Sequence, residues 1–197
     1  MRLVCATANP HKVTELARML PAWVQLVPRP PEVGDVEETA PTLEGNAIIK
    51  AVEIANAADE WAIADDTGLE VMALDGEPGV RSARFAGETA TDADNRALLL
   101  ERMNGVSDRR ARFRTVVALV NSRGEIHVVS GECAGTITED EQGSNGFGYD
   151  ALFSPDAADG RTFAQMSAEE KDAMSHRGKA LEQLPSLLSR IFGLPTP

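Results

Sequence analysis

Ala62-Ile63-Ala64-Asp65-Asp66-Thr67-Gly68-Leu69-Glu70-Val71 is the stretch on which the prediction of the fold depends. Its first residues, with Trp61 before them, form a short apolar run that is typical of a buried strand. Two carboxylates, Asp65 and Asp66, come next, and Gly68 favours a sharp turn directly after them. Because α/β sheets commonly bind ligands at the ends of their strands, we expect a ligand site here.

The two neighbouring carboxylates predict a metal ion. Adjacent Asp side chains repel each other, which raises the cost of ionising both. A hard cation such as Mg2+, which prefers oxygen ligands, relieves that repulsion. The alternative is a solvated loop in which one Asp forms a turn, and for an isolated Asp-Asp pair that is the stronger interpretation. The apolar strand before the pair, together with basic and glycine-rich segments elsewhere, favours a functional site.

Composition predicts one domain with a sizeable core. The chain has 197 residues, of which 43% are apolar. It shows no signal-peptide pattern and no apolar run long enough to cross a bilayer. Its two cysteines, Cys5 and Cys133, lie among apolar or small residues, as reduced core thiols do. We therefore expect a single domain over residues 1–197, located in the cytoplasm and without a membrane partner.

The charge balance is strongly acidic. Asp and Glu number 31 against 19 Lys and Arg, for a net charge of −12. Such a field opposes binding to the backbones of DNA or RNA, and no basic stripe is present, so we expect no nucleic-acid partner. A small polyanion is still compatible where a basic cluster, a helix N-terminus or a metal ion overcomes the field.

The N-terminal segment has the pattern of a strand, a tight turn and a capped helix. Residues 2–7 predict the strand, Asn9 is a good N-cap, and Pro10 suits the first helical position of a helix over residues 10–20. Backbone N–H groups there, with Lys12 in the first turn, are able to hold a phosphate. An ordinary capped helix is the alternative, although a cation in the first turn opposes the helix dipole, and such local conflicts tend to mark functional sites.

Further periodic segments alternate between helix and strand, which predicts an α/β fold. Lys50 lies off the centre of an apolar helical stripe. Most such lysines are solvated, but we retain this one as a candidate substrate-binding residue. The expected elements are a strand over 23–27, a helix over 42–59, a short strand over 69–74, a helix from Thr91 to before Gly105, and a β-hairpin of 112–121 with 125–133.

A glycine-rich loop, Gln142–Asp150, carries two aromatic residues and an acid. Phe147 on such a loop is suited to stack on a nucleobase, and Asp150 to accept hydrogen bonds from base N–H groups. A simple turn with a buried Phe explains the loop equally well.

The densest basic cluster follows the capping box that begins at Ser167. It comprises Lys171, His176, Arg177 and Lys179, and a final helix runs on to residue 192 with a break or kink at Pro185. A lone His is more often structural. In so acidic a chain, His-Arg beside two lysines favours a site for an anion or for the edge of a base.

Taken in order, these segments resemble the Ham1/RdgB family of inosine triphosphate pyrophosphatases. No single piece decides the match, but the ordered set is specific and spans nearly the whole chain. The matching pieces are Ala6-Thr7-Ala8-Asn9-Pro10-His11-Lys12 with Glu15; Glu37-Glu38-Thr39; Glu44-Gly45-Asn46-Ala47 with Lys50-Ala51; Ala64-Asp65-Asp66-Thr67-Gly68-Leu69; Pro78-Gly79-Val80-Arg81-Ser82-Ala83-Arg84; Gly146-Phe147-Gly148-Tyr149-Asp150; and Ser175-His176-Arg177-Gly178.

The resemblance implies an α/β protein with an elongated mixed β-sheet flanked by helices and two lobes around a central cleft, usually as a homodimer. It implies a Mg2+-dependent hydrolase that splits nucleoside triphosphates into monophosphate and pyrophosphate. The implied substrates are the non-canonical purine nucleotides ITP, dITP and XTP, so the reaction would cleanse the nucleotide pool.

The resemblance also assigns roles, residue by residue. Asp66 is the implied general base and a Mg2+ ligand, and Glu38 is the second ligand. The implied substrate contacts are, for the triphosphate, Thr7, Ala8, Asn9, Pro10, His11 and Lys12; for the base, Phe147, Gly148, Tyr149, Asp150, His176 and Arg177; and, elsewhere on the substrate, Thr67 and Lys171. Ala8 stands where the family usually has Gly, and Thr67 where Ser is common. Thr67 keeps the hydroxyl.

Two other functions fit parts of this pattern. A Maf-like pyrophosphatase would cleave the same bond in pyrimidine or modified nucleotides. A nucleotide-binding sensor would bind without turnover, but a pure triphosphate binder gains little from acids that face its ligand. The lack of an evident Ser or Cys nucleophile with a partner base fits phosphoryl transfer, which needs positioning more than covalent chemistry.

Overall fold

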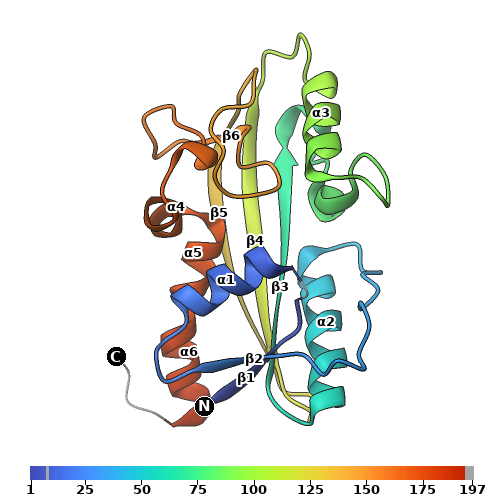
Figure 1. Ribbon diagram of the computed structural model, residues 1–197, viewed down its shortest axis with the longest axis vertical. Helices are drawn as coiled ribbons and strands as arrows, with labels where there is room; N and C mark the ends of the chain where they lie inside the picture. The colour runs from blue at the N-terminus through green and yellow to red at the C-terminus, as the bar shows by residue number, and fades with distance from the viewer. Residues whose placement is uncertain (8, 194–197) are drawn as a thin grey trace. The chain divides into compact units, whose positions relative to one another are not determined.

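The computed structural model describes residues 1–7 and 9–193, and its fold is α/β (Figure 1). One six-stranded sheet has the order β2-β1-β3-β4-β5-β6. β1 pairs in parallel with β2 and with β3, whereas β5 and β6 are antiparallel, so the predicted mixed sheet is confirmed. The strands are β1 (Arg2–Cys5), β2 (Gln25–Pro28), β3 (Ala62–Val71), β4 (Arg110–Val120), β5 (Ile126–Ile137) and β6 (Phe153–Pro155).

Helices occupy most of the intervening segments. The α-helices are α1 (Pro10–Met19), α2 (Leu43–Ala58), α3 (Asp92–Arg102), α4 (Ala168–Met174), α5 (His176–Leu181) and α6 (Leu184–Phe192). The 3-10 helices are η1 (Met72–Leu74), η2 (Gly79–Arg84) and η3 (Phe163–Gln165). Pro185 lies in the first turn of α6, where no intrahelical N–H is needed, which explains why the predicted final helix is divided into α5 and α6.

The chain forms two compact units. Unit 1 comprises residues 1–66, 115–131 and 179–197, and unit 2 comprises residues 67–114 and 132–178. Strands β3, β4 and β5 contribute residues to both units, and the boundary in β3 is the peptide bond between Asp66 and Thr67. A single domain over residues 1–197, the elongated shape and the central cleft stay predictions.

In unit 1, helices cover both faces of the strands. Ile63 of β3 packs in an apolar cluster with Leu16 of α1 and Leu188 of α6, and all three are fully buried. Side chains of a strand alternate between its faces, so the neighbours of Ile63 lie on the other face, which α2 covers. The apolar stripe predicted for α2 is buried there as Ala47, Ala51, Ile54 and Ala55.

Unit 2 has its own apolar core. Phe113 of β4 meets Phe153 edge to face, with ring centroids 4.8 Å apart, a favourable arrangement for two aromatic rings. Leu99 of α3 and Met103, which directly follows that helix, are fully buried in the same cluster. Cys133 is buried here and Cys5 in unit 1, and neither forms a disulfide within the described residues.

Strand β3 is longer than the sequence predicted. We expected the strand to end at the Asp-Asp pair, with a turn at Gly68, but β3 continues unbroken to Val71. The reason is that Leu69 and Val71 alternate and are both fully buried in the core of unit 2, which keeps the segment extended. Residues 72–74, predicted as strand, form η1 instead.

Within residues 1–7 and 9–193, no helix combines the length and the apolar character needed to cross a membrane.

The core of unit 1 yields the first prediction. Leu16→Ala removes a side chain with no exposed surface, and we expect a loss of about 2–5 kcal/mol in the free energy of unfolding, from lost apolar burial and the cavity left behind. Ile126→Ala is the control, because Ile126 is 44% exposed, and its cost should stay below about 1 kcal/mol. Urea unfolding of both variants measures the difference, and equal losses would contradict this account of the core.

Candidate functional site

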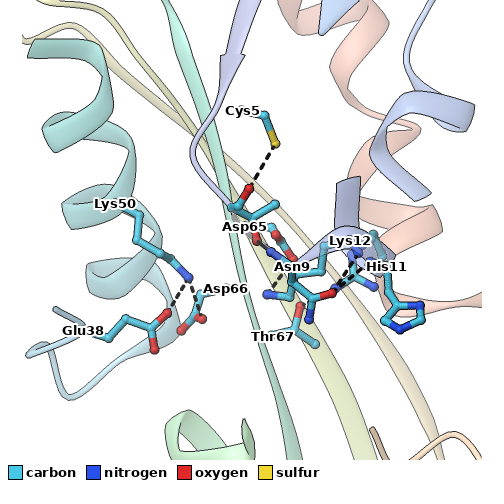
Figure 2. A network of polar contacts seen from close by, with 11 residues as sticks. Cys5, Asn9, His11, Lys12, Glu38, Lys50, Asp65, Asp66 and Thr67 are labelled. Atoms are coloured by element: carbon cyan, nitrogen blue, oxygen red, sulfur yellow. Dashed lines mark hydrogen bonds and ion pairs between the residues drawn. The ribbon is translucent and has the colours of Figure 1, made fainter. Parts of the chain in front are cut away.

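Asp65 and Asp66 point to opposite faces of β3. They are consecutive residues of a continuous strand, whose side chains alternate, and Figure 2 shows each carboxylate with a different set of partners. Our expectation that both carboxylates face one ligand and repel each other there is therefore wrong. It depended on a strand that ended before the pair, and a strand that continues separates the two side chains.

Asp65 pairs with Lys12 of α1. Its side chain is fully buried, and its Oδ2 lies 3.1 Å from Lys12 Nζ, whose side chain is 15% exposed (Figure 2). A buried carboxylate is costly unless it is paired, so this contact accounts for the lysine in the first turn of the helix. The local conflict with the helix dipole is offset by the buried negative charge opposite it.

On the other face of β3, Asp66 and Glu38 converge on one cation. Lys50 Nζ donates to Asp66 Oδ1 at 3.0 Å and to Glu38 Oε1 at 2.7 Å (Figure 2). Lys50 and Asp66 are both buried. The two predicted metal ligands thus meet in space, and Lys50 of α2 does approach them.

The cluster of Glu38, Lys50 and Asp66 has more negative than positive charge. Burial raises the pKa of the Asp66 carboxyl above its ordinary value; Lys50 opposes that rise and Glu38 adds to it. Burial lowers the pKa of Lys50, but the nearby carboxylates, Asp66 first, more than offset it and leave that pKa raised. Both groups therefore hold protons more tightly than usual, as expected where two carboxylates share one ammonium. Such a cluster favours a further cation.

Two residues of α2 hold the segment that follows Glu38, and sequence reasoning gave them no individual role. The Asn46 amide oxygen accepts a hydrogen bond from the backbone N–H of Ala40 at 2.9 Å, which ties the segment after Glu38 to α2. A Cβ at Gly45 would lie 2.5 Å from the Ala40 Cβ, so only glycine permits this approach. Gly45 and Asn46 belong to a segment that matches the family, but their partner, Ala40, lies on another segment, so the sequence alone does not explain them.

These carboxylates fit a magnesium ion. They supply hard oxygen ligands, and Asp66 Oδ2 is buried with no hydrogen-bond partner among residues 1–7 and 9–193. The same part of the chain contains no group of three or more His, Cys, Asp or Glu able to hold a metal by itself. Mg2+ is commonly held by one or two carboxylates with phosphates and water, which matches a pair such as Glu38 and Asp66.

The predicted phosphate segment lies at the start of α1. The Asn9 side chain accepts hydrogen bonds from the N–H groups of His11 at 2.9 Å and Lys12 at 3.4 Å, which confirms the predicted N-cap. Thr7 Oγ1 accepts from the N–H of Asn9 at 3.2 Å. Pro10 is the first helical residue and is exposed, as is His11. Ala8 lies outside the described residues, and phosphate binding by this segment stays a prediction.

In unit 2, Phe147 is flanked by two cations. Lys171 Nζ lies 5.0 Å and Arg177 Cζ 5.8 Å from the centroid of its ring, both within the range of a cation–π interaction. The ring is half-buried, so the loop presents it at the surface of unit 2. The basic cluster and the glycine-rich loop, predicted separately from the sequence, thus come together.

Asp150 holds the loop that carries Phe147. Its Oδ2 accepts from Lys171 Nζ at 2.7 Å and from the N–H of Phe147 at 2.9 Å. Gly146 has a φ of +76°, and a Cβ there would collide with the Asp150 carboxylate, so the turn requires glycine. The predicted contact of Asp150 with a base stays a prediction, whereas its contacts within the loop are direct.

The remaining predicted residues are also placed within unit 2. Arg177 is buried and donates to Thr67 Oγ1 at 3.1 Å. His176 is buried and stacks on Phe113, with ring centroids 4.5 Å apart. Tyr149 lies in the core, and its hydroxyl donates to the Ser82 carbonyl at 2.9 Å. Gly148 has a φ of +58°.

The predicted residues therefore fall into two groups. Unit 1 holds the carboxylates and lysines, Glu38, Asp65, Asp66, Lys12 and Lys50. Unit 2 holds the aromatic ring and the buried cations, Phe147, Lys171 and Arg177. Asp66 and Thr67 are consecutive in β3, so the two groups are directly linked along the chain.

An α/β fold with two carboxylates suited to a metal ion, and with an aromatic ring flanked by two cations, is what we expect of a protein that acts on nucleotides. Comparison with known proteins specifies the family. A model of the Ham1 family matches residues 3–187, so the chain belongs to the Ham1 family.

Similar proteins span the full length of the chain. The dITP/XTP pyrophosphatase of Desulforamulus reducens is 46% identical over 198 residues, which cover 98% of this chain and 98% of that protein. Among solved structures, a HAM1 protein from Coxiella burnetii has 39% identity and a TM-score of 0.89, covering 96% of this chain and 99% of that one. The Staphylococcus aureus Ham1 protein has 38% identity and a TM-score of 0.87, covering 97% and 100%.

The geometry around Asp66 predicts how its carboxyl titrates. In the metal-free protein its pKa should lie above the ordinary value, because burial disfavours the charged form. In Lys50→Met the pKa should rise further, since the removed ammonium favours the carboxylate and Glu38 remains. Carbon-13 NMR of the Asp66 carboxyl against pH measures both, with the exposed Lys179→Met as control. A lower pKa in Lys50→Met would contradict the role of this ammonium.

Proposed function

We propose that this chain hydrolyses non-canonical purine nucleoside triphosphates (ITP, dITP and XTP) to the monophosphate and pyrophosphate, with Mg2+ as cofactor. The observation that carries the proposal is the convergence of Glu38 and Asp66 on one cation in a chain of the Ham1 family. A dITP/XTP pyrophosphatase that is 46% identical over nearly the whole chain supports the choice of substrate.

The excess negative charge around Asp66 supports the metal. A triphosphate carries several negative charges and approaches carboxylates only if a cation lies between them. Glu38 and Asp66 would hold Mg2+, with further ligands from phosphate oxygens and water. The ion, when bound, neutralises charge that develops on the phosphoryl oxygens and on the pyrophosphate that leaves.

Asp66 is suited to act as the general base. In the metal-free chain burial raises the pKa of the Asp66 carboxyl, so the group is more basic there than a solvated carboxylate. Lys50 holds the carboxylate by a 3.0 Å hydrogen bond, and so orients it. The water attacks the α-phosphorus, and Asp66 takes a proton from that water. The bond between the α-phosphorus and the oxygen that bridges it to the β-phosphate breaks. Pyrophosphate leaves with the electron pair of that bond.

The residues of unit 2 are suited to recognise the base. Phe147 offers a half-buried ring on which a purine stacks, and the flanking Arg177 and Lys171 supply donors. Hypoxanthine and xanthine carry a keto oxygen at the six-position, which accepts from such a donor. Adenine carries an amino group there, and two donors that face each other leave both hydrogen bonds unmade.

A homodimeric state and a cytoplasmic location are part of the proposal. Both rest on the resemblance to the Ham1/RdgB family, and a cytoplasmic enzyme would meet the nucleotide pool directly. Sedimentation of the purified chain measures the first, and fractionation of cells the second.

The reaction itself is tested by pyrophosphate release across a panel of triphosphates: dITP, ITP, XTP, ATP, GTP, CTP and UTP. We expect release from the first three with Mg2+ present and its loss when the ion is chelated. Asp66→Asn should lower kcat about a hundredfold or more, because it removes the general base. Asp35→Asn is the control, since the Asp35 side chain is 88% exposed. A preference for pyrimidine or modified nucleotides would favour a Maf-like specificity, and binding without release would favour a sensor.

The two adjacent glutamates give a matched test of the metal site. Glu38→Gln removes a carboxylate that shares its cation with Asp66, so the Mg2+ concentration for half-maximal rate should rise roughly tenfold or more. Glu37 is exposed, and Glu37→Gln should leave that concentration within about twofold of wild type. The measurement is a Mg2+ titration at saturating dITP, and equal behaviour of the two variants would remove Glu38 from the metal site.

A further inference from the structure

Helix α3 binds both backbone polar groups of one residue, Gly148, in the loop that carries Phe147. The Gly148 N–H donates to Asp92 Oδ2 at 2.7 Å. The Gly148 carbonyl accepts from Arg96 Nη1 at 3.0 Å. Neither Asp92 nor Arg96 belongs to a segment that the family resemblance brings out, and the proposed reaction gives neither a role.

The positions of Asp92 and Arg96 suit this grip. They are four residues apart on a helix, so their side chains project from one face. Asp92 is the first residue of the helix, where the helix dipole stabilises its negative charge, and it accepts from the N–H of Gly148. Arg96 meets an acceptor, and its Nε also lies 3.0 Å from Glu141 Oε1, just ahead of the loop. The Arg96 side chain is 19% exposed, so packing restricts it.

Gly148 connects two anchored residues. Before it, Phe147 is tied through its own N–H to Asp150. After it, the Tyr149 hydroxyl is tied to the Ser82 carbonyl in the core. Without the contacts from α3, the backbone of Gly148 would be free to rotate, because it adopts a φ of +58° and glycine populates many conformations. The direction of the Phe147 ring depends on the backbone conformation of Gly148.

We propose that Asp92 and Arg96 are positioning residues for base recognition: they fix the backbone of Gly148 and thereby place the Phe147 ring for stacking on the purine. The inference deepens the proposed function and rests on it. Neither residue is assigned a contact with substrate, so neither is catalytic. Their effect is on how tightly the base is bound.

A purely structural role for the two residues would look different in kinetics. Loss of stability lowers the amount of active enzyme, which reduces kcat for all substrates and leaves KM unchanged. A misplaced ring weakens binding of the base, which raises KM and leaves the hydrolytic step at Asp66 intact. The split between KM and kcat therefore distinguishes the two roles.

The test compares Asp92→Ala and Arg96→Met with the conservative Asp92→Asn and Arg96→Lys, which keep an acceptor and a donor. We expect KM for dITP to rise roughly tenfold in the first two, as for loss of a charge-assisted hydrogen bond, with kcat within about twofold of wild type. The conservative variants should recover at least half of the affinity on a logarithmic scale. Arg102→Met is the control, because Arg102 lies on the same helix but contacts the exposed Glu77 and the ring of Phe85.

The outcomes separate this inference from the proposed function. If wild-type enzyme does not hydrolyse dITP or XTP, the proposed function fails and the inference fails with it. If wild type is active but KM is unchanged in Asp92→Ala and Arg96→Met, or rises no more than in Arg102→Met while kcat drops, only the inference is overturned. Thermal unfolding identifies a variant that does not fold. If Arg96→Met does not fold, the KM of Asp92→Ala, a change at an exposed position, decides whether the inference holds.

Discussion

The alternation of side chains at Asp65 and Asp66 is the constraint on which the rest of unit 1 depends. Consecutive side chains of a strand point to opposite faces of the sheet, so the two buried carboxylates lie on different faces. Each carboxylate needs a cation on its own face, because a buried unpaired charge is costly. Lys12 of α1 meets the first and Lys50 of α2 meets the second. The ion pairs therefore link α1 to Asp65 and α2 to Asp66, two consecutive residues of β3, and specify how the helices dock.

The two ion pairs are not equivalent, because Lys12 pairs with Asp65 whereas Lys50 is shared by two carboxylates. Lys12 and Asp65 form a pair in which the carboxylate is fully buried. Asp66 shares its lysine with Glu38, which leaves a cluster with excess negative charge and a raised pKa at Asp66. Such a cluster is unfavourable for folding, because two carboxylates are desolvated around one ammonium. Proteins retain unfavourable charge of this kind at sites that bind a cation or move a proton.

Local signals in the sequence were enough to predict helix starts and the matching segments, but not which face a residue takes. Asn9 capped α1 as predicted, because its cap depends only on neighbouring residues. Gly68 was misinterpreted as a turn, since burial of Leu69 and Val71 in a separate core decides the matter. Arg96 could not be assigned at all: its partner, Gly148, lies 52 residues away, and no local pattern reports such a contact.

The residues around Phe147 in unit 2 use charge in the opposite way from the cluster of Glu38, Lys50 and Asp66. In a chain with a net charge of −12, unit 2 buries two cations, Lys171 and Arg177, beside one aromatic ring. Burying a cation is costly unless acceptors surround it, and Asp150, the Thr67 hydroxyl and the face of Phe147 provide them. These acceptors come from β3 and from the loop of residues 142–150, so the cations are fixed before any ligand arrives. A site with donors fixed in advance discriminates a keto group from an amino group better than a flexible one, because it cannot turn away from the wrong base.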